Sequence, residues 1–373
     1  MTGDPSVAEP GVANSTISFG QSTALGGPAG ELGRAMRTGI FAAFEEANSK
    51  GGVAGRRLLL TSYDDGYEPD RAIDNTRRLI ERDKVFALIG EVGTPTSKAA
   101  QPIATESKVP FIGPFTGAGF LRDPAHGNIV NLRASYAQET EAWIRHLTED
   151  LGHKRIAILY QDDSFGRVGL AGVEQALERR GLSVAAEGTY KRNTTAVKTA
   201  LLRIRKARPE SVVMVGAYQP IAEFIKLAKR TGLDATFVNI SFVGSKALAK
   251  ELGEDGTGVI VSQVVPFPWD RSLPIIKEYQ GALRALDPEA EPGFVSLEGY
   301  LVGRLTIMAL KKMSGAITRS GFLTTISNLG QFDLGGFELA FGHDDNQGSD
   351  AVFLTVIQSD GTFRAVDRLD PAS

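Results

Sequence analysis

Three threonines, Thr94, Thr96 and Thr116, lie in loops rich in glycine and other small residues. Each loop follows a short apolar run that is typical of a buried β-strand, at residues 85–89 and 109–112. Parallel strands bring the loops that follow them to one edge of the sheet, where ligands bind. Hydroxyl groups beside the free N–H groups of a helix N-terminus suit a carboxylate or another small anion. The alternative for Thr94 or Thr96 is a helix N-cap, the commoner role of an isolated threonine before a helix.

These loops belong to a pattern in which strands and helices alternate, and the pattern occurs in two blocks. The first block predicts strands at residues 16–19, 58–62, 85–89, 109–112 and 128–132, and helices at 33–48, 70–82 and 96–107. The second predicts strands at 155–160, 184–186, 211–215, 236–240 and 258–264, and helices at 138–151, 170–180, 195–206 and 220–231. Two helical stretches follow, at 272–286 and 295–313, and then an alternating tail from residue 335.

Two such blocks predict an α/β protein with two Rossmann-like lobes, each a parallel sheet with helices on both faces. The late helices would return the chain to the first lobe, and the tail would close against the second. Three crossings, near Arg133, Val264 and Gly335, would then form a hinge. The expected organisation is a disordered leader at 1–14, a first lobe from 15–133 with 265–335, and a second lobe from 134–264 with 336–373.

Composition narrows the class of protein. The 373 residues are 42% hydrophobic and carry a formal net charge of −3, which argues against a surface for nucleic acid or anionic membrane. There is no cysteine, so disulfides, thiolate catalysis and a lipidated cysteine are excluded. The sequence contains no run of eighteen or more apolar residues, the length that a membrane-spanning helix needs. The polar start at 1–14 is either a disordered leader or the mature end that remains after signal removal.

The sequence offers no sign of catalysis, cofactor binding or a metal site. No HExxH or GxSxG pattern surrounds the four histidines or any serine. The GGPAG loop at 26–30 lacks the GxGxxG spacing of dinucleotide sites. Paired aspartates at 64–65, 162–163 and 344–345 suit turns better than metal ligation. Trp269, between prolines beside a lobe crossing, is a candidate to line the mouth of a cleft.

From about residue 17 to 366, the ordered motifs of the chain resemble a known family. They are TALGGPAGELG, EEANSKGGVAGRRLLLTSYDD, ALIGEVGTPTSKAAQPI, VPFIGP, NLRAS, RIAILYQDDSFG, VVMVGAYQP and GSD. Their order and spacing resemble the type I periplasmic binding proteins of ABC importers, in the branched-chain amino acid and amide (Leu/Ile/Val-binding protein-like) branch. The resemblance implies a Venus-flytrap protein that closes on a small solute and catalyses no reaction.

The resemblance also implies which residues contact the ligand. On the first lobe, the loops that grip a carboxylate correspond to Gly93 and Thr94 and to Phe115, Thr116 and Gly117, and an aromatic lid corresponds to Leu32. On the second lobe, the cleft positions correspond to Phe165, to Tyr218 or Gln219, and to Ser241.

Two departures from the family concern the ligand's ammonium group. Ser241 stands where amino-acid binders present a carboxylate, and Gln138, with Glu139 beside it, stands where an aspartate is common. Glu91, Glu139 and Asp163 are candidate replacements, although each also suits a surface or capping role. A ligand with an apolar or aromatic body and a carboxylate or amide head is therefore expected over a free α-amino acid.

The resulting hypothesis is a monomeric, exported, periplasmic protein whose signal peptide is absent from this chain. It would hand its small-molecule ligand to ABC permease subunits, without a cofactor. The alternative is a sensory or regulatory ligand-binding protein on the same fold.

Overall fold

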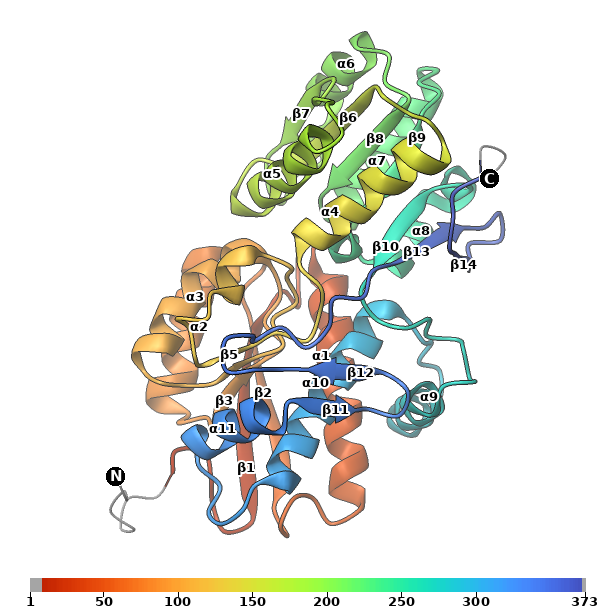
Figure 1. The fold of residues 1–373 in the computed structure, drawn as a ribbon. Coiled ribbons are helices and arrows are strands. Elements are labelled where there is room, and N and C mark those ends of the chain that lie inside the picture. The colour runs from red at the N-terminus through yellow and green to blue at the C-terminus, as the bar shows by residue number, and fades with distance from the viewer. Residues whose placement is uncertain (1–8, 371–373) are drawn as a thin grey trace.

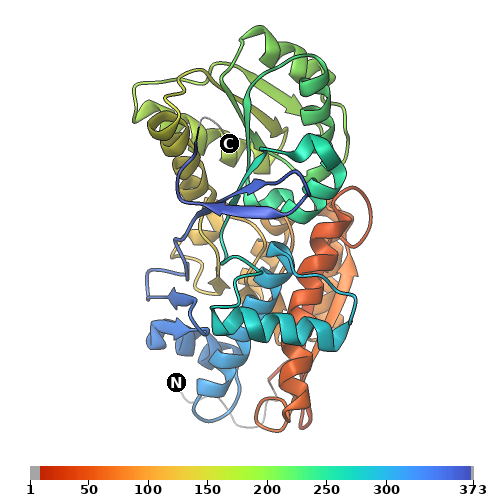
Figure 2. The same ribbon diagram turned by 90° about the vertical axis from the view of Figure 1, so that its right-hand side faces the viewer.

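Two separate β-sheets form the two lobes of the chain, which the computed structural model describes over residues 9–370 (Figure 1). The strands alternate with helices in each lobe, so the predicted α/β class with two parallel-sheet lobes is confirmed. Figure 2 shows that the lobes lie end to end and that several connecting segments pass between them.

The first lobe contains a five-stranded parallel sheet in the order β2-β1-β3-β4-β5. Its strands are β1 (Thr16–Thr23), β2 (Arg57–Asp64), β3 (Ala87–Ile89), β4 (Phe111–Ile112) and β5 (Ile129–Val130). Its helices are α1 (Gly30–Ser49), α2 (Pro69–Arg77), α3 (Thr94–Glu106), α9 (Pro274–Leu286), α10 (Phe294–Lys312) and α11 (Arg319–Leu329). Helix α1 packs on α10 and α2 packs on α3.

Glycines allow α1 and α10 to approach each other closely. A Cβ atom on Gly39 of α1 would lie 1.9 Å from the Ser296 carbonyl oxygen, and one on Gly299 of α10 would lie 2.3 Å from that of Met36. Both positions therefore require a residue without a side chain. This contact fixes the late helix α10 to the first helix of the chain and so returns the chain to the first lobe.

The second lobe contains a seven-stranded sheet in the order β14-β13-β10-β9-β8-β6-β7. Its strands are β6 (Ile156–Gln161), β7 (Glu187–Tyr190), β8 (Ser211–Val215), β9 (Thr236–Asn239), β10 (Ile260–Gln263), β13 (Phe353–Ile357) and β14 (Phe363–Val366). Its helices are α4 (Tyr136–Arg145), α5 (Ser164–Glu178), α6 (Lys198–Lys206), α7 (Tyr218–Arg230) and α8 (Ser245–Leu252). Strands β6 to β10 are parallel, and β13 and β14 add an antiparallel edge.

The third crossing lies later than the expected position near Gly335. Strands β11 (Gln331–Asp333) and β12 (Glu338–Ala340) pair only with each other and lie beside the first lobe (Figure 1). Residue Asn131 of the first lobe still pairs with Gln347. The chain therefore joins the second sheet only between Gln347 and β13, because alternation predicts a strand but not the sheet that it joins.

The expected disorder at residues 1–14 is wrong for the part that the structure describes. Residues 1–8 lie outside the described residues. From Glu9 on the chain is fixed: the Gly11 carbonyl accepts a 2.8 Å hydrogen bond from the Ser18 N–H, and Ala13 donates to Thr16 at 2.9 Å. Gly11 also lies directly against the backbone of Phe86. This segment packs on the first lobe.

Candidate ligand-binding site

Thr94 and Thr116 meet at the ends of β3 and β4. Their hydroxyl oxygens lie 2.7 Å apart, and both residues are buried. Neither Thr94 nor Thr96 is an N-cap, because the N-cap of α3 is Gly93, which has no side chain. The first N–H of α3 that has a backbone acceptor is that of Ser97, which donates to the carbonyl of the N-cap residue Gly93. The hydroxyls therefore lie beside free N–H groups of the first turn of α3.

Thr96, in contrast, does not face this site. Its hydroxyl donates to the Val92 carbonyl at 2.6 Å and lies 3.1 Å from the Gly93 carbonyl. The two threonines of the same turn thus differ in function: Thr96 stabilises the loop, and Thr94 presents its hydroxyl to Thr116.

Two glycines bring aromatic rings against the loops. Gly93 has a φ of 108°, which side chains rarely adopt, and a Cβ there would lie 2.3 Å from the ring of Tyr67. A Cβ on Gly117 would lie 2.5 Å from the ring of Tyr136. Gly93 and Gly117 therefore shape the site rather than only grip a ligand.

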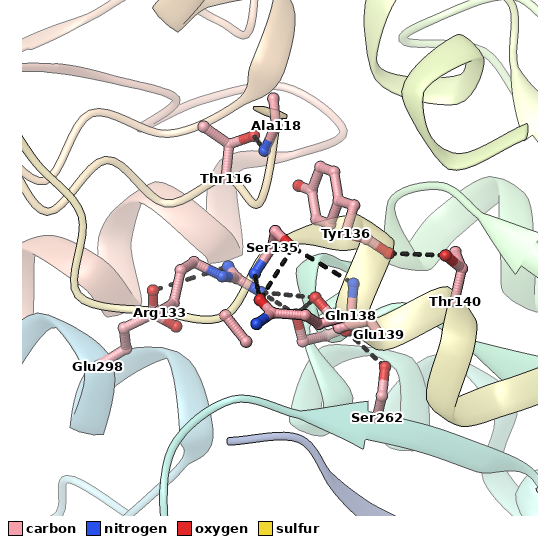
Figure 3. A network of polar contacts seen from close by, with 12 residues as sticks. Thr116, Ala118, Arg133, Ser135, Tyr136, Gln138, Glu139, Thr140, Ser262 and Glu298 are labelled. Carbon is pink, nitrogen blue, oxygen red and sulfur yellow. Dashed lines mark hydrogen bonds and ion pairs between the residues drawn. The ribbon is translucent and has the colours of Figure 1, made fainter. Parts of the chain in front are cut away.

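Tyr136, the first residue of α4, adds a third hydroxyl to the site (Figure 3). Burial raises the pKa of Tyr136, whereas the charge of Arg133 and the hydroxyls of Thr116 and Thr94 act in the opposite direction. Three neutral hydroxyls thus gather at the point where the first crossing enters the second lobe.

Arg133, on the first crossing, is a completely buried cation near the rings of Phe115 and Tyr136. Its Nη2 donates to Ser241 Oγ and, at 3.3 Å, to Glu139, and its Nη1 forms an ion pair with Glu298 at 3.6 Å. The guanidinium carbon lies 4.9 Å from the centre of the Phe115 ring. Burial alone would lower the pKa of Arg133, but Glu298 and Glu139 outweigh it and raise the pKa. Within the described chain Nη1 has only its ion pair with Glu298 and Nε has no hydrogen-bond acceptor, so Nε remains available as a donor.

Glu139 lies at the second-lobe end of the same network (Figure 3). Its carboxylate accepts hydrogen bonds from the N–H of Ser241 at 2.9 Å, from the Ser241 hydroxyl at 2.8 Å, and from the Ser262 hydroxyl at 2.5 Å. Arg133 is a further donor. Glu139 is thus buried and fully engaged, so the expectation of a surface or capping role is wrong for it.

The other two candidate partners for an ammonium group are Glu91, whose environment disfavours its charged form, and Asp163, which already has partners. Burial raises the pKa of Glu91 well above its usual range, and the nearby charge of Asp65 adds to this effect. Glu91 is therefore not a surface carboxylate, and its environment disfavours the charged form. Asp163 is the N-cap of α5: it accepts the N–H of Phe165 at 2.9 Å and pairs with Arg192 at 2.9 Å.

Aromatic rings from both lobes meet between the loops. Phe242 lies 5.3 Å from Phe115 and 4.7 Å from Phe165, measured between ring centres, and 5.9 Å from Tyr67. Tyr136 lies 5.4 Å from Phe165. We call these five residues the aromatic cluster. Because its members are buried and belong to both lobes, a ligand can reach Thr94 only when the lobes separate.

The remaining expected residues lie further along the interface between the lobes. Leu32 contacts Gly244, where a Cβ would lie 2.3 Å from the leucine Cδ2. Tyr218 is buried at the start of α7, and burial raises its pKa, an effect that the backbone of Glu31 opposes. Gln219 is partly exposed, and no contact joins it to the threonine hydroxyls. Ser241 bonds to Glu139 and Arg133.

Trp269 lies outside the aromatic cluster. Its ring stacks on Phe363 of β14 at 5.7 Å and meets the edge of Phe294 of α10 at the same distance. The tryptophan therefore contacts one residue from each lobe on the side of the second crossing.

Polar contacts also join the lobes near Tyr67 of the aromatic cluster. Gln161 donates to the Tyr67 hydroxyl at 3.2 Å, and Arg192 pairs with Glu68 at 2.8 Å. Asn193 donates to Glu68 at 2.7 Å. Tyr67 and Glu68 follow β2, whereas the other three residues belong to the second lobe, so the structure is a closed form.

A comparison with known proteins identifies the family. The sequence model described as "Periplasmic binding protein" matches residues 16–362. The chain belongs to the periplasmic binding protein family. A leucine-, isoleucine-, valine-, threonine- and alanine-binding protein of Pseudomonas aeruginosa PAO1 is 24% identical over 329 residues, which cover 86% of each chain. The predicted resemblance is confirmed.

Solved structures of this periplasmic binding protein family agree. A possible leucine/isoleucine/valine-binding protein from Rhodopirellula baltica SH 1 has a TM-score of 0.90 and 40% identity, over 97% of this chain and 98% of that one. A substrate-binding periplasmic protein from Ralstonia solanacearum has a TM-score of 0.88 and 27% identity, over 94% and 99%. These relatives are binding proteins, which supports a solute-binding role without catalysis.

Among residues 9–370, no helix has both the length and the apolar character needed to cross a bilayer. Within the same residues, no three side chains of histidine, aspartate or glutamate converge as metal ligands would.

Sequence reasoning missed four residues of this site: Tyr67, Arg133 as a binding group, Tyr136 and Phe242. Tyr67 follows the paired aspartates after β2, and Arg133 and Tyr136 belong to the crossing. A buried arginine in a crossing between two lobes is a signal that could have been read, because such a cation needs partners from both.

Proposed function

We propose that this protein is an extracytoplasmic solute-binding protein that captures a small carboxylate-bearing ligand between its lobes and delivers it to an ABC permease. Membership of the periplasmic binding protein family supports the solute-binding role. The ligand enters when the lobes separate and is enclosed when they return to the closed arrangement.

The observation that carries the ligand class is the arrangement of donors around Thr94. The hydroxyls of Thr94, Thr116 and Tyr136 are joined by the free N–H groups of α3 and by Arg133, whose Nε has no hydrogen-bond acceptor among the described residues. Hydroxyls, a guanidinium and backbone N–H groups all donate to a carboxylate. Arg133 already faces the carboxylates of Glu139 and Glu298, and its Nε remains as a further donor for a carboxylate oxygen of the ligand.

Among the described residues, the carboxylates around this site are poor partners for an α-ammonium group. Glu139 already accepts from Ser241, Ser262 and Arg133, Asp163 caps α5, and burial disfavours the charged form of Glu91. An ammonium group buried here would lose its hydration without a carboxylate to replace it. We therefore propose that the ligand is a carboxylic acid with an apolar or aromatic body, rather than a free α-amino acid, although named relatives are amino-acid binders.

Competition between leucine and its deaminated keto acid, 4-methyl-2-oxopentanoate, tests this proposal. The two molecules share the carboxylate and the branched body and differ in the ammonium group. Isothermal calorimetry should show the keto acid binding at least tenfold more tightly, which corresponds to about 1.4 kcal/mol. Leucine binding tenfold more tightly would mean that the ammonium has a partner and would refute the ligand class.

A further inference from the structure

A cavity of about 570 Å³ lies between the lobes, beside the candidate site. Leu32 and Ala35 of α1 and Phe294 and Val295 of α10 line it from the first lobe, and Gly244 and Ala247 line it from the second. Its size falls within the roughly 300–1,000 Å³ that small-molecule sites occupy. We call it the side cavity.

The short helical turn Ser241–Val243 lies between the candidate site and the side cavity. At one end of this turn, Ser241 bonds to Arg133 and Phe242 packs on Phe115. At the other end, Gly244 lines the side cavity and contacts Leu32. A leucine side chain can change rotamer, and the residue facing it is a glycine with no side chain of its own. A change of the Leu32 rotamer would therefore open space beside Gly244, next to this turn.

The chemistry of the side cavity suits an apolar group rather than a second charged one. Leucine, valine, alanine and phenylalanine side chains form the apolar part of the wall, in which Leu32 and Leu283 are almost completely buried, and Thr38, Ser245 and Ser296 add hydroxyls. Four of the five charged residues that line the cavity pair with each other, Lys246 with Glu291 at 2.5 Å and Arg34 with Glu31 at 2.6 Å, and the fifth is Lys250. Lys246 and Glu291 are about half and three-quarters exposed, so this edge of the cavity faces solvent. The cavity therefore offers contact area to a hydrocarbon chain.

From these observations the structure assigns a ligand class to the proposed function, on which this inference rests: an aliphatic monocarboxylic acid of medium chain length. Its carboxylate would bind at Thr94, Thr116 and Arg133, and its tail would pass Leu32 into the side cavity. A ligand of amino-acid size would fill only the first of these spaces.

Chain-length dependence of binding tests the assignment. Butanoate and octanoate have the same head group and differ by four methylenes. Each methylene that enters an apolar cavity should tighten binding by roughly fourfold. Calorimetry on the wild-type protein should therefore show octanoate binding at least tenfold more tightly than butanoate.

Two variants that fill the cavity from opposite lobes separate this effect from non-specific adhesion of a longer chain. Ala247→Trp, on α8, and Ala35→Trp, on α1, each place a ring in the side cavity, and both positions are only partly buried. Either variant should lose at least tenfold in affinity for octanoate and keep its affinity for butanoate. Ala171→Trp is the matched control, because Ala171 is exposed on α5 and does not line the cavity. Thermal melting establishes that each variant folds, and one folded cavity variant is sufficient.

The outcomes distinguish the two proposals. If butanoate and octanoate bind equally, or if a folded cavity variant keeps the wild-type preference for octanoate, the side cavity does not hold the tail, and the proposed carboxylate site stands. If neither acid binds while 4-methyl-2-oxopentanoate does, this assignment fails and the proposed function stands. If none of the three acids binds, the proposed carboxylate ligand fails as well.

Discussion

Thr94 provides the most direct test of the anion site at the level of one residue. Replacing Thr94 with valine keeps the shape of the side chain and removes the hydroxyl that faces Thr116. Loss of one hydrogen bond to a charged group should weaken carboxylate binding by about 1.5–3 kcal/mol. Calorimetric titration with the keto acid measures this change.

Thr306→Val is the matched control for that substitution. Thr306 is also buried in a helix, but its hydroxyl donates to the Val302 carbonyl within α10, away from the site. This variant should lose some stability and keep its affinity. Equal losses of affinity in the two variants would remove Thr94 from the site.

Sequence predicted the loops of the site better than it predicted the charged groups around them. The loops at Gly93–Thr94 and Thr116–Gly117 are local patterns, in which small residues follow a strand. Arg133 lies near them only because the crossing folds back between the lobes, and Glu139 reaches Ser241 only across the second lobe. Contacts of this kind depend on how separate elements dock, which no local pattern specifies.

At the scale of elements, the loop after β7 contributes to closure. Arg192 on this loop pairs with Glu68 after β2 at 2.8 Å, and it is about one-fifth exposed. Replacing Arg192 with methionine should weaken ligand binding about two- to fivefold, because a partly exposed ion pair contributes up to about 1 kcal/mol and this one joins the lobes. Stopped-flow measurement should show the change mainly as faster ligand release.

The control for this element is Arg167→Met. Arg167 also pairs with an aspartate, Asp162, at 2.8 Å, but both residues belong to the second lobe. Ligand release should therefore stay at the wild-type rate. If Arg192→Met also left release unchanged, the pair with Glu68 would have no part in closure.

The order of the helices and strands could be predicted from the sequence, but some strand boundaries and some strand pairings could not. Strand β7 was expected at residues 184–186 and lies at Glu187–Tyr190. It is an edge strand paired only with β6, so few contacts fix its limits in the sequence. Strand β12 falls in the range 336–373 that was expected in the second lobe, yet it forms a hairpin with β11 beside the first lobe (Figure 1). The alternation of apolar residues in a strand shows that one of its faces is buried. It does not show which lobe buries that face, because both lobes have an apolar surface.

At the scale of the whole molecule, Glu298 connects pH with stability. Burial raises the pKa of Glu298 from 4.5 to about 7, although the charge of Arg133 opposes the rise. The folded protein therefore holds this proton more tightly than the unfolded chain does. The resulting stabilisation is complete below about pH 4.5 and is lost as pH rises towards 7, by a free energy on the order of 3 kcal/mol.

Replacing Glu298 with glutamine should remove this contribution. Urea unfolding at pH 5 and pH 7.5 should show a smaller fall in the free energy of unfolding for the variant than for the wild type. Burial also raises the pKa of Asp65, to about 6, so some fall with the same sign should remain in both proteins. Identical falls in the two proteins would show that Glu298 does not titrate as described.

The two-lobed architecture could be predicted because the alternation of strand and helix recurs many times along the chain. Each strand–helix unit repeats the same hydrophobic period, and the α1–α10 contact returns the chain to its first lobe through glycines that sequence alone does not single out. Errors in single elements therefore did not change the class of fold.

Trp269 gives the protein an optical probe of its own motion. It is one of only two tryptophans, it is about one-third exposed, and it touches Phe294 of one lobe and Phe363 of the other. Separation of the lobes would pull one of these rings away and admit water to the indole, which shifts its fluorescence emission to longer wavelength. The other tryptophan, Trp143, is buried within the second lobe and should give a constant background. Opening and closing can thus be followed in real time on the unmodified protein, with no attached dye.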